Sequence, residues 1–325
     1  MIEKVIVTGC AGFVGSNLTQ RLLNAGIKVT GVDNFSYGEK RNLQNFNNHP
    51  NFKFVEGDLT QFSTLDKLEG EVIVHLASQK IPRYSNAFRT LDENSRMLKN
   101  VVDKANRDKI RVVFASTSDI YGRNPNIPYS ETSEIVLGPT TVKRWAYALS
   151  KIYGEHLLIA NNEEFGLNYT IIRIFGSYGP HHNLTWWGGP QSSFITKAFK
   201  KEEIEIHGDG LQTRTFTYVD DTVDGFFRAV TMPQAVNDIF NVASEPNEEI
   251  SIIDLAKFIW KLVNGFDNDV KLKFIPYSNF GNYEDVRRRV PDINKIKTKL
   301  GFQPKYTLEQ GMLKTIAWQK QLLGF

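Results

Sequence analysis

The chain has 325 residues, of which 41% are hydrophobic and 23% are charged, proportions typical of a globular protein with a large core. Its net charge of +3 is too small to indicate a nucleic-acid or membrane partner. The one cysteine, Cys10, excludes a disulfide within the chain and fits a reducing cytoplasm. We expect no signal peptide and no membrane-spanning helix, because the first residues have the pattern of a strand and no apolar run is long enough.

The first thirty-odd residues have the pattern of a strand, a glycine-rich turn, a helix, a second strand and an acid. Residues 4–8 are a β-branched run, and residues 16–23 repeat apolar side chains at helical spacing. Residues 28–32 form a second apolar run, which ends on Asp33. The turn between the first strand and the helix is Gly9-Cys10-Ala11-Gly12-Phe13-Val14-Gly15. This order predicts a dinucleotide-binding unit, with the phosphates at the N-terminus of the helix.

The glycines and the acid have separate expected roles in such a unit. Gly9 makes the tight turn, Gly12 lets the backbone approach a pyrophosphate, and Gly15 lets the helix pack closely on the strand. A carboxylate at Asp33 accepts hydrogen bonds from both ribose hydroxyls and repels a 2′-phosphate. We therefore expect the cofactor to be NAD rather than NADP.

Further strands and helical patterns alternate through the first half of the chain. Strands are expected at residues 52–57, 72–78 and 111–116, and a helix at residues 95–106. This alternation predicts an α/β fold, a Rossmann-type doubly wound parallel sheet. Ligands of such sheets bind outside the carboxyl ends of the strands. The residues expected there are Gly12, Asp33, Ser78 and Thr117.

A helix expected from residue 144 onward carries Tyr147 and Lys151, which are four residues apart and therefore share one face. The charge of Lys151 and a positive nicotinamide favour the phenolate, so we expect the pKa of Tyr147 to fall toward neutrality. Such a tyrosine can take a proton from a sugar hydroxyl while hydride leaves that carbon for the nicotinamide. We expect Lys151 to hold the nicotinamide ribose as well, and Thr117 to share the proton at the reacting oxygen.

Together these motifs resemble the extended short-chain dehydrogenase/reductase superfamily, and within it the NAD-dependent nucleotide-sugar epimerases, dehydratases and decarboxylases. The resemblance covers nearly the whole chain and rests on the glycine turn, Asp33, Asp58, Ser116-Thr117-Ser118, Tyr147, Lys151 and the segments 172–180 and 206–221. It implies an NAD-binding Rossmann domain over residues 1–170, which also receives parts of 215–245. A smaller C-terminal lobe, mostly residues 171–325, is implied to bind the nucleotide sugar.

The resemblance also implies the residues of the site. Those expected to bind the cofactor are Gly9, Gly12, Phe13, Val14, Gly15, Asp33, Asn34, Asp58, Leu59, Leu76, Ala77, Ser78, Tyr147 and Lys151. Arg214 matches the arginine that grips the substrate diphosphate. Gly176 replaces an asparagine that helps to hold the substrate phosphate, so either a backbone N–H substitutes or the substrate sits differently. No metal is expected, because His181 and His182 lack acidic or cysteine neighbours at ligand spacing.

The implied first step is oxidation of the sugar at C4, but the reaction that follows stays open. Thr117-Ser118-Asp119 and the arginine of Arg289-Val290-Pro291-Asp292 resemble the UDP-glucuronate decarboxylases, although Asp119 stands in place of a glutamate. Arg289 would bind the carboxylate or the developing charge, and Asp119 would act as acid or base if its pKa is raised. We place decarboxylation slightly ahead of 4-epimerisation, followed by 4,6-dehydration and 4-dehydrogenation. A non-catalytic NAD(H)-binding module is the alternative of another class.

The expected partners are a nucleotide-diphosphate sugar and a second copy of the chain. The family often builds a homodimer from a helix near residues 95–106 and the helix that carries Tyr147, although packing on the sheet explains the same apolar stripe. The sequence leaves open the base, the sugar and the pathway. It also assigns no role to the pairs His181-His182 and Trp186-Trp187.

Overall fold

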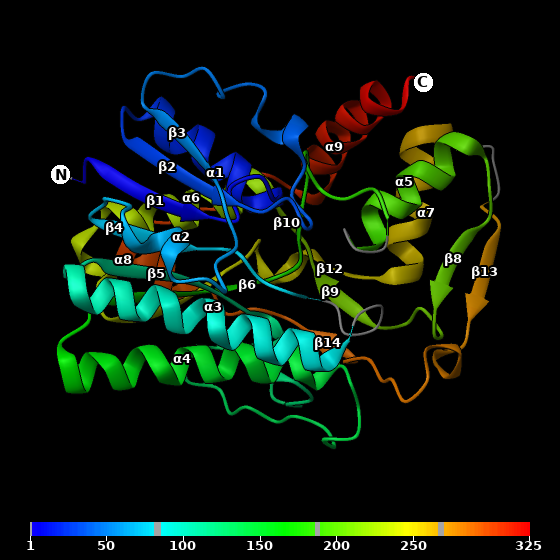
Figure 1. Cartoon of the computed structure of the whole chain (residues 1–325). Coiled ribbons are helices and arrows are strands. Elements are labelled where there is room, and N and C mark those ends of the chain that lie inside the picture. The colour runs from blue at the N-terminus through cyan, green and yellow to red at the C-terminus, as the bar shows by residue number, and fades with distance from the viewer. Residues whose placement is uncertain (1, 81–85, 186–188, 266–269) are drawn as a thin grey trace.

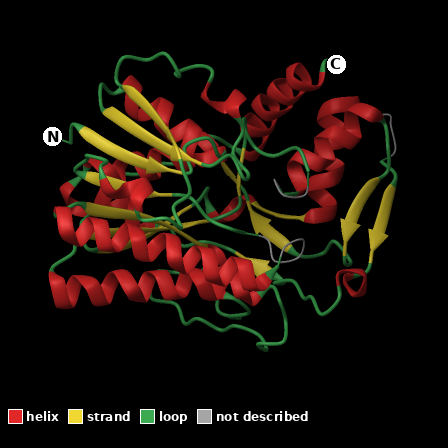
Figure 2. Ribbon diagram, in the orientation of Figure 1, coloured by secondary structure: helices red, strands yellow, loops and turns green. Residues whose placement is uncertain are grey.

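A parallel sheet flanked by helices forms the centre of the computed structural model, which describes residues 2–80, 86–185, 189–265 and 270–325 (Figures 1 and 2). Its strands are β1 (Lys4–Thr8), β2 (Lys28–Asp33), β3 (Phe52–Glu56), β4 (Val72–His75), β5 (Arg111–Thr117), β6 (Tyr169–Ile174) and β11 (Asp238–Val242). Within the described residues they pair in the order β11-β6-β5-β4-β1-β2-β3, and every neighbouring pair is parallel. The strand order reverses direction between β1 and β4, as in a Rossmann fold, which confirms the predicted fold class.

Helices pack on both faces of this sheet because alternate side chains of each strand point to opposite sides. In β1, Val5 and Val7 join the core that contains Leu18 of helix α1 (Phe13–Asn24), whereas Ile6 joins the core that contains Leu158 of helix α4 (Trp145–Phe165). Helix α1 packs against α6 (Val219–Thr231), and α3 (Ala87–Asp108) packs against α4 as the long pair seen in Figure 1. None of the described helices has both the length and the apolar character needed to cross a bilayer.

The helices of the described chain are α1 (Phe13–Asn24), α2 (Ser63–Asp66), α3 (Ala87–Asp108), α4 (Trp145–Phe165), α5 (Pro190–Lys200), α6 (Val219–Thr231), α7 (Ile252–Asn264), α8 (Asn294–Leu300) and α9 (Leu308–Leu323). Short 3-10 turns lie at η1 (Lys40–Leu43), η2 (Ser118–Tyr121), η4 (Pro233–Ala235), η5 (Pro246–Glu248) and η6 (Tyr277–Phe280). The remaining strands are β7 (Ser177–Tyr178), β8 (Ile204–His207), β9 (Thr213–Thr215), β10 (Thr217–Tyr218), β12 (Glu249–Ser251), β13 (Leu272–Ile275) and β14 (Arg288–Arg289).

A smaller lobe lies beyond the carboxyl ends of the central strands (Figure 2). In it, α5 packs against α7, β8 pairs with β13, and β9 lies between β12 and β14. The second half of the chain also returns to the central sheet, because β11 and α6 belong to it. The division of the chain into domains at residue 170 stays a prediction.

The register of the sheet brings four connections to one edge. Thr8 at the end of β1 lies beside His75 of β4, and Thr117 at the end of β5 lies beside Ile174 of β6. The glycine turn, the loop after β4 and the segments after β5 and β6 therefore begin side by side. This is the edge at which ligands of open parallel sheets bind.

Candidate active site

A cavity of about 460 Å³ opens at this edge and extends from the glycine turn to Tyr147 and Arg289. A second cavity of about 130 Å³ continues from it toward Asp33, and the two share Gly9, Gly12, Tyr37, Leu76 and Ser78 as lining residues. Every residue predicted to bind the cofactor lines one cavity or the other. The two cavities together form one elongated site with an acid at one end and the catalytic candidates at the other.

The glycine turn is closed so tightly that side chains are excluded at two positions. Gly9 has φ of +73°, and a Cβ placed there would lie 2.8 Å from the backbone nitrogen of Ala77. A Cβ on Gly15 would clash with the carbonyl oxygen of Gly9. Helix α1 begins immediately after Gly12, so its first N–H groups, which lack acceptors within the helix, face the cavity that Phe13 lines.

Asp33 is fixed at the far end of the elongated site. One carboxylate oxygen accepts the N–H of Ala11 at 2.9 Å and the other accepts the N–H of Phe35 at 2.8 Å. Burial raises the pKa of Asp33, and these N–H donors oppose that effect. The carboxylate lies beside Asn34 and Asp58 on the wall of the smaller cavity.

The catalytic candidates meet where strand β5 ends and helix α4 begins. Tyr147 and Thr117 line the same cavity, and the ammonium of Lys151 lies 5.9 Å from the centre of the Tyr147 ring. Burial lowers the pKa of Lys151 to about 7, with Glu155 opposing the effect. Burial also raises the pKa of Tyr147, and Asp119 adds to the rise. The expected fall in the pKa of Tyr147 therefore does not arise from the protein alone, because Lys151 is itself buried and weakly basic.

A buried ion pair fixes the helix under this site. Glu155, one turn beyond Lys151, accepts Nη2 of Arg173 at 2.7 Å and Nε at 3.0 Å, and both side chains are 6% exposed. Ser116, the neighbour of Thr117, donates its hydroxyl hydrogen to the same carboxylate. The pair thereby connects α4 to both β5 and β6.

Arginines and acids alternate along the other wall of the larger cavity. Oδ1 of Asp119 accepts Nη2 of Arg144 at 2.9 Å and Nη2 of Arg289 at 2.5 Å. Oδ1 of Asp285 accepts Nη1 of Arg144 at 2.9 Å and Nη2 of Arg214 at 2.8 Å. The chain Arg289–Asp119–Arg144–Asp285–Arg214 is thus one connected network.

This network corrects the expectation for Asp119. Burial raises the pKa of Asp119, but Arg289, Arg144 and Arg214 together outweigh burial and leave the pKa below its usual value. The condition for Asp119 to act as a proton donor, a raised pKa, is not met. Arg289 also donates to the hydroxyl of Ser118 at 3.3 Å, so Ser118 and Asp119 both orient this arginine.

Of the predicted substrate residues, Gly176 lines the larger cavity, whereas Arg214 does not. Gly176 has φ of +40°, and a Cβ there would lie 2.7 Å from the carbonyl oxygen of Thr215, which explains why an asparagine is disfavoured at this position. Arg214 does not line either cavity and reaches the site through Asp285, which it shares with Arg144.

The loop after β7 contacts the glycine-turn helix. Nδ1 of His181 lies 2.9 Å from the hydroxyl of Ser16, and the ring of His182 stacks on Phe13 with centroids 4.2 Å apart. Both histidines therefore pack against helix α1. Trp186 and Trp187 lie outside the described residues.

Comparisons with known proteins agree with this geometry. Residues 5–243 match the model of the NAD dependent epimerase/dehydratase family. The chain belongs to this family. It is 32% identical to a UDP-N-acetyl-alpha-D-glucosaminuronate decarboxylase of Bacillus cytotoxicus, over 99% of both proteins, and 34% identical to UDP-glucuronic acid decarboxylase 1 of Xenopus tropicalis, over 99% of this chain and 73% of the relative. The solved UDP-glucuronic acid 4-epimerase of Bacillus cereus, in complex with UDP-glucuronic acid and NAD, superposes with a TM-score of 0.87 at 26% identity, over 98% of this chain and 99% of that one.

As a member of this family the chain is an NAD-dependent enzyme that modifies nucleotide sugars. The site fits NAD by its own geometry, because Gly9 and Gly15 leave no room for side chains at the turn and Asp33 presents a carboxylate at the adenosine end. Tyr147 and Lys151 would contact the nicotinamide half. The individual roles of the site residues stay predictions.

Several residues that line the larger cavity received no site role from the sequence, among them Lys80, Arg144, His182, Gln191 and Tyr283. Arg144 had a usable signal, because it stands three residues before Tyr147 and so lies near the same helix face. The hydroxyl of Tyr283 accepts Nη1 of Arg144 at 2.6 Å, but Tyr283 belongs to an irregular segment before β14. No local pattern predicts where such a segment lies.

Proposed function

We propose that this enzyme decarboxylates a nucleotide-linked uronic acid after oxidising the sugar at C4. The observation that carries the proposal is the pair of guanidinium groups of Arg144 and Arg289, which converge on Asp119 beside Tyr147 at the cavity wall. With Arg214 and Asp285 included, three cations face two anions, so the network retains positive charge for an acidic ligand. Arginine forks suit both carboxylates and diphosphates.

The first chemical step needs Thr117 and Tyr147. The phenolate oxygen of Tyr147 takes the proton of the sugar C4 hydroxyl, and the hydroxyl of Thr117 hydrogen-bonds to the same sugar oxygen. NAD supplies the hydride acceptor for C4 and, later, the hydride that restores the alcohol. Lys151 holds the ribose and keeps positive charge near the phenolate when it is protonated.

The 4-ketone makes the sugar a β-keto acid. The bond between C5 and the carboxyl carbon breaks, CO₂ leaves, and the electron pair remains as an enolate whose oxygen is the former C4 oxygen. Tyr147, now protonated, and Thr117 donate hydrogen bonds to that oxygen. Arg289 and Arg144 hold the carboxylate before it leaves. A proton from water then adds to C5, hydride returns to C4, and Tyr147 gives its proton back to the C4 oxygen.

We assign Asp119 a positioning role within this reaction. Its carboxylate is ionised and accepts from two arginines at once, so it holds both guanidinium groups at the cavity wall. A substrate carboxylate would share the same donors. This role differs from that of a proton donor and leaves C5 to be protonated by another group.

4-Epimerisation of a uronic acid is the second candidate, and the ionised state of Asp119 favours it. An epimerase needs Thr117, Tyr147 and Lys151, with cations for the carboxylate, but no acid to protonate C5. The Bacillus cereus 4-epimerase that superposes on this chain was solved with UDP-glucuronic acid, which supports the same substrate class. For 4,6-dehydration, the acid that faces Tyr147 in the described cavity is Asp119, whose pKa its arginine neighbours lower.

The experiment is to incubate the purified protein with UDP-glucuronate, UDP-N-acetylglucosaminuronate and UDP-glucose, without added cofactor, and to record product masses. We expect a uronate to lose CO₂ and UDP-glucose to be turned over poorly. Loss of water would indicate a dehydratase, and an isomer of unchanged mass would indicate the 4-epimerase.

Dimerisation and a cytoplasmic location are also part of this proposal. Helices α3 and α4 expose large apolar side chains, namely Phe88 at 72%, Leu149 at 48% and Tyr153 at 45%. A second copy of the chain packed on these helices would cover them. Analytical ultracentrifugation of the wild-type protein and of Leu149→Glu tests the dimer, and a wild-type monomer would contradict it.

A further inference from the structure

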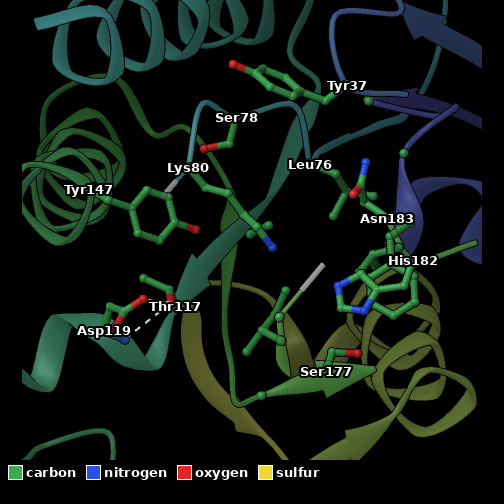
Figure 3. A pocket seen from close by; sticks show the side chains of 18 of the residues that line it. Tyr37, Leu76, Ser78, Lys80, Thr117, Asp119, Tyr147, Ser177, His182 and Asn183 are labelled. Carbon is green, nitrogen blue, oxygen red and sulfur yellow. Dashed lines mark hydrogen bonds between the residues drawn. The ribbon is translucent and has the colours of Figure 1, made fainter. Parts of the chain in front are cut away.

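Two buried polar side chains, His182 and Gln191, line the larger cavity, and the proposed chemistry does not use either of them. His182 is 5% exposed and Gln191 is 2% exposed, and both line the cavity. Figure 3 shows His182 facing the cavity across from Tyr147 and Thr117. Nδ1 of His182 and Nε2 of Gln191 have no hydrogen-bond partner in the described part of the chain. Buried polar atoms are rarely left unpaired in proteins, so a missing ligand is a physical explanation.

The two side chains both lie next to Gly189. His182 stacks on Phe13, the first residue of helix α1, with an interplanar angle of 27°. Gln191 is the second residue of α5, and Gly189 stands just before this helix. A Cβ built on Gly189, whose φ is +93°, would lie 3.3 Å from Oε1 of Gln191 and 4.0 Å from Cε1 of His182. Both side chains therefore flank the same glycine.

The His182 and Gln191 side chains are uncharged, unlike those of the arginine network. Burial lowers the pKa of His182 well below its usual value, and the nearby charge of Lys80 lowers it further. A neutral imidazole protonated on Nε2 offers Nδ1 as an acceptor, and the amide of Gln191 offers N–H donors. A donor and an acceptor that flank the same glycine complement a group that carries both a carbonyl oxygen and an N–H.

We infer that His182 and Gln191 bind an amide group of the bound ligand, with Gln191 Nε2 donating to its carbonyl oxygen and His182 Nδ1 accepting its N–H. This inference rests on the proposed function for the identity of the ligands. Two amides suit the position. One is an acetamido group on the sugar, and the other is the carboxamide of the nicotinamide. The cavity wall around Phe13 borders the space that both ligands would occupy.

The test uses His182→Leu and Gln191→Leu in the purified holoenzyme, with Thr19→Val as the matched control. The hydroxyl of Thr19 is also buried and unpaired, but it lies on helix α1 away from both cavities. Two quantities are measured. The first is the ratio of kcat/KM for UDP-N-acetylglucosaminuronate to that for UDP-glucuronate. The second is the rate at which bound NAD is released on dilution.

If the sugar supplies the amide, each variant lowers the substrate ratio by about tenfold, the effect of one lost hydrogen bond to an otherwise unpaired group. If the nicotinamide supplies it, NAD is released about tenfold faster and the ratio is unchanged. The control changes neither quantity. Unchanged ratio and unchanged NAD release in both variants would overturn the inference.

Gln191→Glu keeps the test decisive if the leucine variants fail to fold. It preserves the volume and replaces the N–H donor by an acceptor, so it should weaken amide binding in whichever of the two measurements responds. An unaffected Gln191→Glu protein contradicts the inference. If the wild-type enzyme turns over neither uronate, the proposed function fails by itself, and the NAD-release measurement still tests the amide site.

Discussion

Tyr147 and Asp119 line the same cavity, yet their surroundings shift their pKa values in opposite directions. Burial keeps Tyr147 protonated in the protein by itself, whereas three arginines keep Asp119 ionised against the same burial. Lys151, with a pKa of about 7, is protonated in only part of the molecules at neutral pH. The positive nicotinamide must therefore contribute to forming the phenolate, which couples proton removal to the oxidised cofactor.

Replacing Tyr147 by phenylalanine tests the proton acceptor. The variant retains the packing of the ring but has no oxygen to take the proton of the C4 hydroxyl. We therefore expect kcat to fall by about a hundredfold to ten-thousandfold. Tyr153→Phe, on the exposed side of the same helix, is the control and should retain full activity. Steady-state rates on UDP-glucuronate measure both. A Tyr147→Phe enzyme as fast as the wild type would remove Tyr147 from the mechanism.

The pH dependence of Asp119→Asn tests the positioning role. Because the folded-state pKa of Asp119 is below its usual value, the ion pairs stabilise the folded protein above about pH 4, and this gain is lost as the pH falls through the lowered pKa. Asp119 therefore does not titrate between about pH 5 and 9. The variant should have a raised KM and a pH–rate profile with the same limbs as the wild type. Disappearance of a limb would show that Asp119 exchanges protons during turnover.

At the scale of elements, the catalytic helix α4 depends on contacts below its active face. Glu155 binds Arg173 of β6 and Ser116 of β5, and Arg173 also donates to the hydroxyl of Tyr121 at 2.9 Å. The contacts that hold α4 in place therefore lie one helical turn beyond Lys151 and about two turns beyond Tyr147. Removing one partner of such a buried ion pair lowers the stability of the fold strongly, because the remaining buried charge has no partner.

Arg173→Leu should lower the free energy of unfolding by about 3–5 kcal/mol, since it leaves the Glu155 carboxylate buried without its partner. The double variant Arg173→Leu with Glu155→Leu should recover a large part of this loss, because no uncompensated charge remains. Urea denaturation measures both proteins. A single variant that loses less than about 1 kcal/mol would mean that the pair is dispensable to the fold.

At the scale of the whole molecule, the sheet and the cofactor half of the site were predictable from local patterns. Buried β-branched runs and the glycine turn act within a few residues of one another, and parallel topology brings the strand ends together. Arg144 had a signal in its place before Tyr147, but its partners were not predictable, because the network joins the start of α4 to η2, β9, β14 and the irregular segment that holds Asp285. The ionised state of Asp119 depends on that assembly, and so does the place of Arg214 behind the cavity wall.

The fate of the substrate carboxyl carbon tests the central claim most directly. UDP-glucuronate labelled at the carboxyl carbon is incubated with the purified enzyme, without added NAD, and the released gas and the sugar nucleotide are both analysed for the label. We predict that the label leaves as CO₂ in proportion to product formed, with no net NADH. A product that retains the label, with its C4 configuration inverted, would contradict decarboxylation and assign the enzyme to the 4-epimerases.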